Sequence, residues 1–315
     1  MQFADYIVSV ALQSLTRSLL RLRDPDAGLP DSEARLLAGQ AEELLSLWQM
    51  MQWSVGKLQH DAARRDLREI VAICTREEAP EIRGARRLLQ SAGADSEEAA
   101  GLADFIAGAP AVDSGGISHT LCDRLSCLLQ DESARWREYQ PLRQVAEEAL
   151  IEHGMLRAFE RAEKLVKRLD LIAAEGQSAS QKRLLRAARW LRHCTHHLEL
   201  LRPALSEAGR TRRWHLTRLA VKVEDQLELE AFARTLRRSG IKGKVAARLE
   251  KVLRRERRHL AKQRGKLVAG AFVGATQSYR EEIAAAVEQL GLKEIVLLPL
   301  EARGGVVDTG GPQSF

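Results

Sequence analysis

The stretch that decides the fold is Ser180-Gln-Lys-Arg-Leu-Leu-Arg-Ala-Ala-Arg-Trp-Leu-Arg-His-Cys-Thr-His-His-Leu-Glu-Leu-Leu201. In this stretch, mostly apolar side chains recur every three or four residues, which places them on one face of a helix. These expected core residues are Leu184, Ala187, Ala188, Leu191, Cys194, Thr195 and Leu198. Ser180 is a suitable N-cap, and Pro203 cannot continue the helix. The pattern therefore predicts an amphipathic helix over 180–201.

The opposite face of this helix carries cations at spacings of three and four residues, within roughly 80° of arc. We call these residues, together with their neighbour Arg192, the first basic stripe: Lys182, Arg186, Arg189, Arg192, His193 and His196. Like charges at this spacing repel one another, so a solvated helix would gain from interleaved glutamates. The competing interpretation is a solvated face whose arginine stems cover apolar surface.

A later helix repeats the arrangement. Its second basic stripe is Lys244, Arg248, Lys251, Arg255, Arg258, Lys262 and Lys266. Two stripes of one sign predict an anionic partner, such as a polyanion that bridges the cations of a stripe. The stripes do not identify that anion.

Charge is divided unevenly along the chain. Residues 1–153 hold 16 Lys and Arg against 25 Asp and Glu, whereas residues 154–315 hold 33 against 18. The overall net charge of +6 therefore combines an acidic half of −9 with a basic half of +15. This asymmetry again favours an anionic partner for the second half.

The remaining periodicity predicts an all-α protein. Good helix formers dominate, and β-branched residues are sparse before the C-terminal tail. Asp31 is the expected N-cap of the second helix. The expected helices cover 2–23, 31–53, 58–75, 80–90, a short piece within 94–116, 117–137, 141–174 with an interruption at Gly154, 180–201, 207–236, 244–268 and 278–290. Residues 292–300 are expected to form a short strand or an extended tail, and 302–315 to be disordered.

Several classes of function are not indicated by the sequence. The four cysteines, Cys74, Cys122, Cys127 and Cys194, match no zinc or disulfide framework and are expected to be reduced core residues. No signal peptide or membrane-spanning segment is expected, which favours a cytoplasmic protein. Phosphate-loop, dinucleotide, hydrolase and kinase motifs are absent. The sequence therefore favours a binding protein without catalytic residues, cofactor or metal. The histidines of His193-Cys-Thr-His-His197 are expected to donate to phosphate or to lie on the surface.

Four stretches of the basic half resemble a known family. Gly154-Met-Leu-Arg-Ala-Phe-Glu-Arg-Ala-Glu-Lys164 is similar to a Gly-Leu-Arg-Arg-x-Tyr helix start, and 186–203 to a basic helix ending in Leu-Leu-x-Pro. Leu219-Ala-Val-Lys-Val-Glu-Asp-Gln-Leu-Glu-Leu229 is similar to Leu-Ala-x-x-Leu-Gly-Asp-x-x-Asp-Leu, and 254–279 to a closing basic helix. These stretches resemble the CHAD family, the conserved histidine α-helical domain, over roughly residues 140–290.

The resemblance implies two pseudo-symmetric bundles of about four helices each, with long antiparallel helices. We expect the first bundle over 1–139, the second over 140–291 and a tail over 292–315. The resemblance further implies binding of inorganic polyphosphate by basic faces around a central groove, and association with polyphosphate granules.

The sequence departs from the family pattern at several positions. The family's leading histidine falls at Leu185, its loop glycine at Glu224 and its second aspartate at Glu228. The corresponding basic helix of the first half, Glu33–Glu43, has one arginine, so half of the cationic lining is expected to be missing.

The leading hypothesis is therefore polyphosphate binding through eleven residues. They are Lys182, Arg186, Arg189, Arg192, His193, His196, Arg248, Lys251, Arg255, Arg258 and Lys262. The alternatives are a nucleic-acid-binding protein, which would use the same stripes, and a scaffold or homo-oligomer joined through its acidic half.

Overall fold

A computed structural model describes residues 3–22, 28–75, 79–91, 97–108, 116–138, 147–238 and 244–292. The all-α prediction is confirmed: these residues are helical almost throughout and form no strand, apart from one isolated antiparallel bridge between Leu29 and Ile117. The elements expected over 292–300 and 302–315 lie outside the described residues, except for Leu292 at the end of the last helix.

Most helices begin and end close to the expected residues. They are α1 (Phe3–Arg21), α2 (Asp31–Met50), α3 (Lys57–Cys74), α4 (Pro80–Ser91), α5 (Glu97–Ala107), α6 (His119–Glu138), α7 (Glu147–Ala149), α8 (Arg157–Ala174), α9 (Gln181–Leu200), α10 (Glu207–Arg238), α11 (Lys244–Ala271) and α12 (Ala275–Leu292). Asp31 is the first residue of α2 and Pro30 occupies the cap position, so the expected Asp31 N-cap is wrong by one residue.

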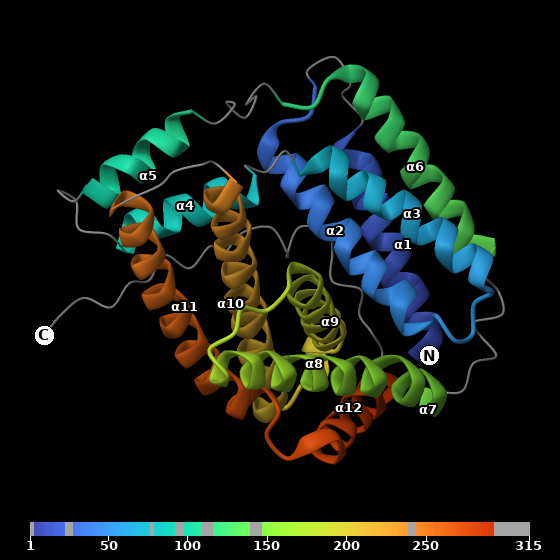
Figure 1. Ribbon diagram of the computed structural model, residues 1–315. Helices are drawn as coiled ribbons and strands as arrows, with labels where there is room; N and C mark the ends of the chain where they lie inside the picture. The colour runs from blue at the N-terminus through green and yellow to red at the C-terminus, as the bar shows by residue number, and fades with distance from the viewer. Residues whose placement is uncertain are drawn as a thin grey trace, which may run out of the picture.

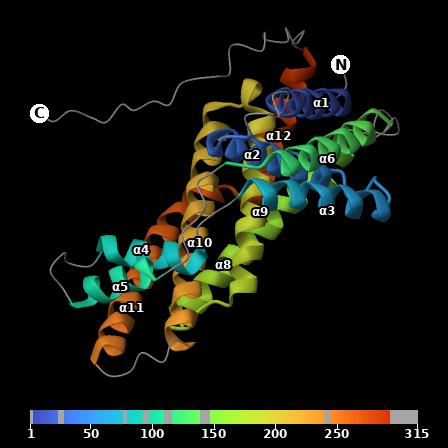
Figure 2. The same ribbon diagram turned by 90° about the horizontal axis from the view of Figure 1, so that it is seen from above.

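The helices form two groups that share one core (Figures 1 and 2). In the first group α1, α2, α3 and α6 pack on one another, and in the second α8, α9 and α10 do so with α11 alongside. α12 joins the second group where Tyr279 stacks on Phe159 of α8. The main cluster of buried apolar side chains is one connected set of contacts that includes residues of both groups, from Phe3 in α1 to Leu290 in α12. The two groups are therefore joined by a continuous apolar interior.

The packing also cuts across the expected boundary near residue 139. α4 and α5 precede that boundary in the chain, yet they pack against α10 and α11 and not within the first group (Figures 1 and 2). A second apolar cluster unites these four helices around Leu88, Leu102, Phe232 and Leu253. Arg83 of α4 adds an ion pair to Glu228 of α10 at 2.7 Å.

The expected interruption at Gly154 lies in a π-helical segment, Leu150–Leu156, between α7 and α8. A Cβ atom on Gly154 would lie 2.6 Å from the carbonyl oxygen of Met50, at the end of α2. Glycine is therefore required at this position because the two backbones approach one another closely. This contact fixes α2 against the second group of helices.

Candidate functional site

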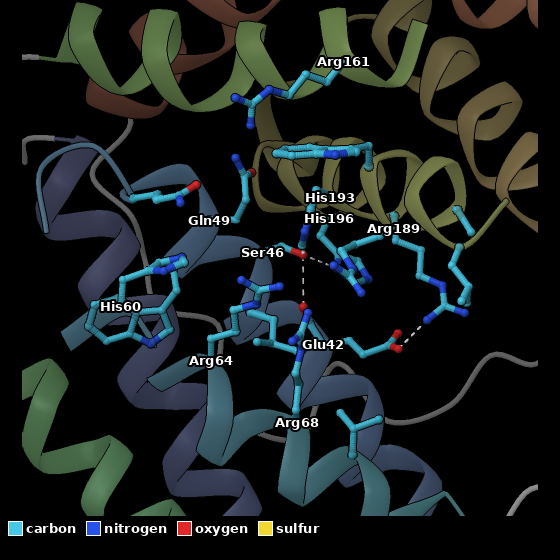
Figure 3. Close-up of a pocket in the computed structure, with 18 of the residues that line it drawn as sticks. Glu42, Ser46, Gln49, His60, Arg64, Arg68, Arg161, Arg189, His193 and His196 are labelled. Carbon is cyan, nitrogen blue, oxygen red and sulfur yellow. Dashed lines mark hydrogen bonds and ion pairs between the residues drawn. The ribbon is translucent and has the colours of Figure 1, made fainter. Parts of the chain in front are cut away.

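A cavity of about 430 Å³ lies where α2 and α3 of the first group face α8, α9 and α10 of the second (Figure 3). We call it the arginine cavity. It is lined by Glu42, Leu45, Ser46, Trp48, Gln49, Gln52, His60, Arg64, Arg68, Val71, Arg161, Leu185, Ala188, Arg189, Trp190, Arg192, His193, His196, Glu224 and Leu227. Its volume falls within the usual range for small-molecule sites.

The charged side chains of this lining are predominantly positive. Five arginines face two glutamates, which leaves a formal excess of three positive charges. Arg192 uses both carboxylates, because its guanidinium pairs with Glu42 of α2 and, at 2.6 Å, with Glu224 of α10. Arg192 therefore ties the two groups of helices together and has little capacity left for a ligand.

The other four arginines have no ion pair with a carboxylate among the described residues: Arg64, Arg68, Arg161 and Arg189. Burial lowers the pKa of Arg68, and the positive charges of Arg64 and Arg189 lower it further. Burial likewise lowers the pKa of Arg189, with added repulsion from Arg64, Arg186 and Arg192. Cations from α3 and α9 are thus close enough to repel one another across the cavity. An anion bound between them would relieve that repulsion.

Arg161 enters the cavity from α8. Its guanidinium lies over the indole of Trp190, 4.8 Å from the ring centroid. This cation–π contact orients Arg161 without neutralising its charge. Figure 3 shows Arg161 reaching toward the cavity from the side opposite Arg64 and Arg68.

The histidines of α9 converge on Ser46 of α2. The Ser46 hydroxyl lies 2.8 Å from Nδ1 of His193 and 2.8 Å from Nδ1 of His196, and it donates to the Glu42 carbonyl oxygen at 3.0 Å. His197 Nε2 lies 3.1 Å from the Ser46 carbonyl oxygen. A hydroxyl has one hydrogen, so at least one of the two imidazoles donates to Ser46 from Nδ1.

This arrangement corrects the role expected for these histidines. Burial lowers the pKa of His193 well below its usual value, and it lowers the pKa of His196 and of His197 to about 4. His193 and His197 are buried and not on the surface. As neutral rings, His193 and His196 offer no positive charge to a phosphate. Their contacts with Ser46 hold α9 against α2.

The first basic stripe is only partly gathered in the cavity. Arg189, Arg192, His193 and His196 line it, whereas Lys182 and Arg186 are exposed on the same helix and lie outside it. Because the charge of Arg186 lowers the pKa of Arg189, the positive surface continues from the cavity along α9.

The second basic stripe does not reach the cavity. Its residues with described side chains are exposed, on the face of α11 opposite the buried Leu249, Leu253 and Leu260: Arg248, Lys251, Arg255, Arg258, Lys262 and Lys266. In Figure 1, α10 stands between α11 and α9. The expectation that both stripes line one groove is therefore wrong.

The sequence interpretation missed the cations of the first group. Arg64 and Arg68 of α3 enter the cavity, so the first half supplies cations from α3 and not from the expected helix at 33–43. The spacing His60-x-x-x-Arg64-x-x-x-Arg68 places all three on one face of a helix and could have revealed them. Nothing local in the sequence marks Arg161.

The positions that depart from the family pattern have definite partners. Leu185 lines the cavity with 45% of its surface exposed. Glu224 holds Arg192, and Glu228 pairs with Arg83 of α4. A glycine at 224 would remove the ion pair that joins Arg192 of α9 to α10.

Three further findings bear on the class of protein. Cys74, Cys122 and Cys194 are buried free thiols, whereas Cys127 is exposed, contrary to the expectation of a core residue. Over the described ranges, no group of three or more His, Cys, Asp or Glu could hold a metal ion, and no helix is long and apolar enough to cross a membrane. Comparison with known proteins finds no matching family model, no curated relative and no similar solved structure.

Proposed function

We propose that this protein binds inorganic polyphosphate, or a similar polyanion, in the arginine cavity without transforming it. The observation that carries the proposal is the set of four arginines without carboxylate partners among the described residues: Arg64, Arg68, Arg161 and Arg189. Guanidinium groups make paired, charge-assisted hydrogen bonds to phosphate oxygens. The resemblance to the CHAD family supports the same ligand, and it extends the proposal to a cytoplasmic protein at polyphosphate granules.

The cavity and the exposed face of α9 would bind different parts of one polyphosphate chain. The cavity would hold a few phosphate units between α3, α8 and α9, and a longer chain would leave along Arg186 and Lys182. Each neutralised phosphate releases counterions, so the affinity should fall steeply as salt concentration rises.

The test is titration of the protein with long-chain polyphosphate by calorimetry, at low and at physiological salt. We expect binding that weakens with salt, and at least a tenfold loss when Arg68 and Arg189 are both replaced by Gln. The matched control is Lys251→Gln with Arg258→Gln, which removes two exposed cations from α11 and should change the affinity less than threefold. A folded Arg68/Arg189 variant with unchanged affinity would refute the cavity as the site.

A second candidate function follows from α11. Its exposed stripe fits the phosphates of a nucleic acid, which bind basic surfaces independently of sequence. In this case the Lys251/Arg258 variant, and not the cavity variant, would lose affinity for duplex DNA. Displacement of DNA by a much lower phosphate concentration of polyphosphate would favour the first proposal.

A further inference from the structure

The arginine cavity has features that an inorganic chain leaves unused. Its wall between the arginines is apolar and aromatic, and includes Leu45, Val71, Leu185, Leu227 and Trp190. A polyphosphate chain has no apolar surface to place against these side chains. Apolar and aromatic walls with a few polar groups at defined positions are typical of sites for organic ligands.

A buried amide in the cavity also lacks a partner. Gln49 of α2 is 8% exposed, and its side-chain Oε1 is buried without a hydrogen bond in the described part of the chain. Figure 3 shows the Gln49 side chain pointing across the cavity toward Arg161. A buried polar atom without a partner costs free energy, so a ligand that supplies the missing bond would bind more tightly.

The missing partner is a hydrogen-bond donor. The Gln49 Oε1 atom is an acceptor. Ionised phosphate groups only accept. A ligand that satisfies this atom must therefore carry a hydroxyl or amino group in addition to its phosphates.

From these three features we infer that the arginine cavity binds a nucleoside oligophosphate: the phosphates between Arg64, Arg68 and Arg189, the base beside the stacked pair of Arg161 and Trp190, and a hydroxyl or amino group on Gln49. This inference rests on the proposed function, because it assumes that the arginines bind phosphate. It adds that the bound phosphate chain is attached to an aromatic base. Stacking on an aromatic side chain tolerates any base, so we expect little preference among bases.

The experiment compares ATP with inorganic tripolyphosphate, which has the same number of phosphates, by calorimetry at one ionic strength without divalent cations. We expect ATP to bind at least about tenfold more tightly, in line with the contribution of one stacked base. Trp190→Leu should abolish that preference, and because Trp190 also orients Arg161 it should weaken tripolyphosphate binding too, but by less than it weakens ATP binding. Gln49→Leu should reduce the preference while keeping the volume of the side chain.

Trp214 provides a matched control. Its ring also carries an arginine, Arg218 at 5.6 Å, but it is 50% exposed on α10 and does not line the cavity. Trp214→Leu should leave both affinities unchanged.

The outcomes separate the inference from the function on which it rests. Equal affinities for ATP and tripolyphosphate in the unmodified protein would overturn the inference and leave anion binding standing. An unchanged ATP preference in both the Trp190→Leu and Gln49→Leu proteins would also overturn it. If neither ligand binds, the proposed function fails together with the inference.

Discussion

Replacing Gly154 by alanine tests the contact that fixes α2 against the second group of helices. The new Cβ would lie 2.5 Å from Cγ and 2.6 Å from the carbonyl oxygen of Met50. The Met50 side chain can turn away, but its carbonyl oxygen belongs to the backbone of α2. Restoring an ordinary contact of 3.4 Å requires the two backbones to separate by about 0.8 Å.

The expected cost follows from this displacement. Overpacking of a tight contact destabilises a protein by about 1–3 kcal/mol. Alanine regains up to about 1 kcal/mol through its higher helix propensity. We therefore expect Gly154→Ala to lower the free energy of unfolding by about 1–2 kcal/mol, and the melting temperature by a few degrees.

The assay is thermal and denaturant unfolding followed by circular dichroism, with Gly39→Ala as the control. Gly39 also lies in a helix, α2, but a Cβ there would meet nothing within 4 Å. Gly39→Ala should therefore stabilise the protein slightly. If Gly154→Ala were as stable as Gly39→Ala, the argument from close backbone approach would be wrong.

Two further predictions concern stability. Because burial lowers the pKa of His196 and of His197 to about 4, the unfolded chain takes up protons first as the pH falls below about 6.5. The free energy of unfolding should thus fall between pH 6.5 and 4, by up to about 3 kcal/mol per histidine. Denaturant titrations at pH 7, 6 and 5 should show that the free energy of unfolding of His197→Gln changes less with pH than that of the unmodified protein. Arg212 is 4% exposed and pairs with Glu282 through two bonds of 2.8 and 2.9 Å, so Arg212→Met should cost about 3–5 kcal/mol by leaving that carboxylate unpaired. Arg218→Met, on the exposed face of the same helix, should cost little in the same unfolding assay, and equal losses for the two variants would contradict this account.

The helices themselves could be predicted from the sequence because each reflects a local pattern. In α9 the apolar period and Pro203 indicate the buried face and the end of the helix within a few residues. The interruption at Gly154 could also be predicted, although the sequence does not show that its cause is the backbone of Met50.

The composition of the site could not be predicted in the same way. A helical period shows that Arg189 and Arg255 both face away from a core, but it does not show which helix lies opposite. Arg189 faces Arg64 and Arg68 across a cavity, whereas Arg255 is exposed and donates to the Ser91 carbonyl oxygen at 2.7 Å. The histidines of α9 were misinterpreted for the same reason: their partner is some 150 residues away in the chain.

That separation has a consequence during synthesis. The bonds from Ser46 to His193 and His196 join residues 147 and 150 positions apart. At about 5–20 residues per second, the ribosome delivers α9 on the order of 10 s after α2. Throughout that interval the side of α2 that later contacts α9 has no helix to pack against. A chain released before α9 is made would therefore keep an apolar helix face exposed and would have only part of its binding site.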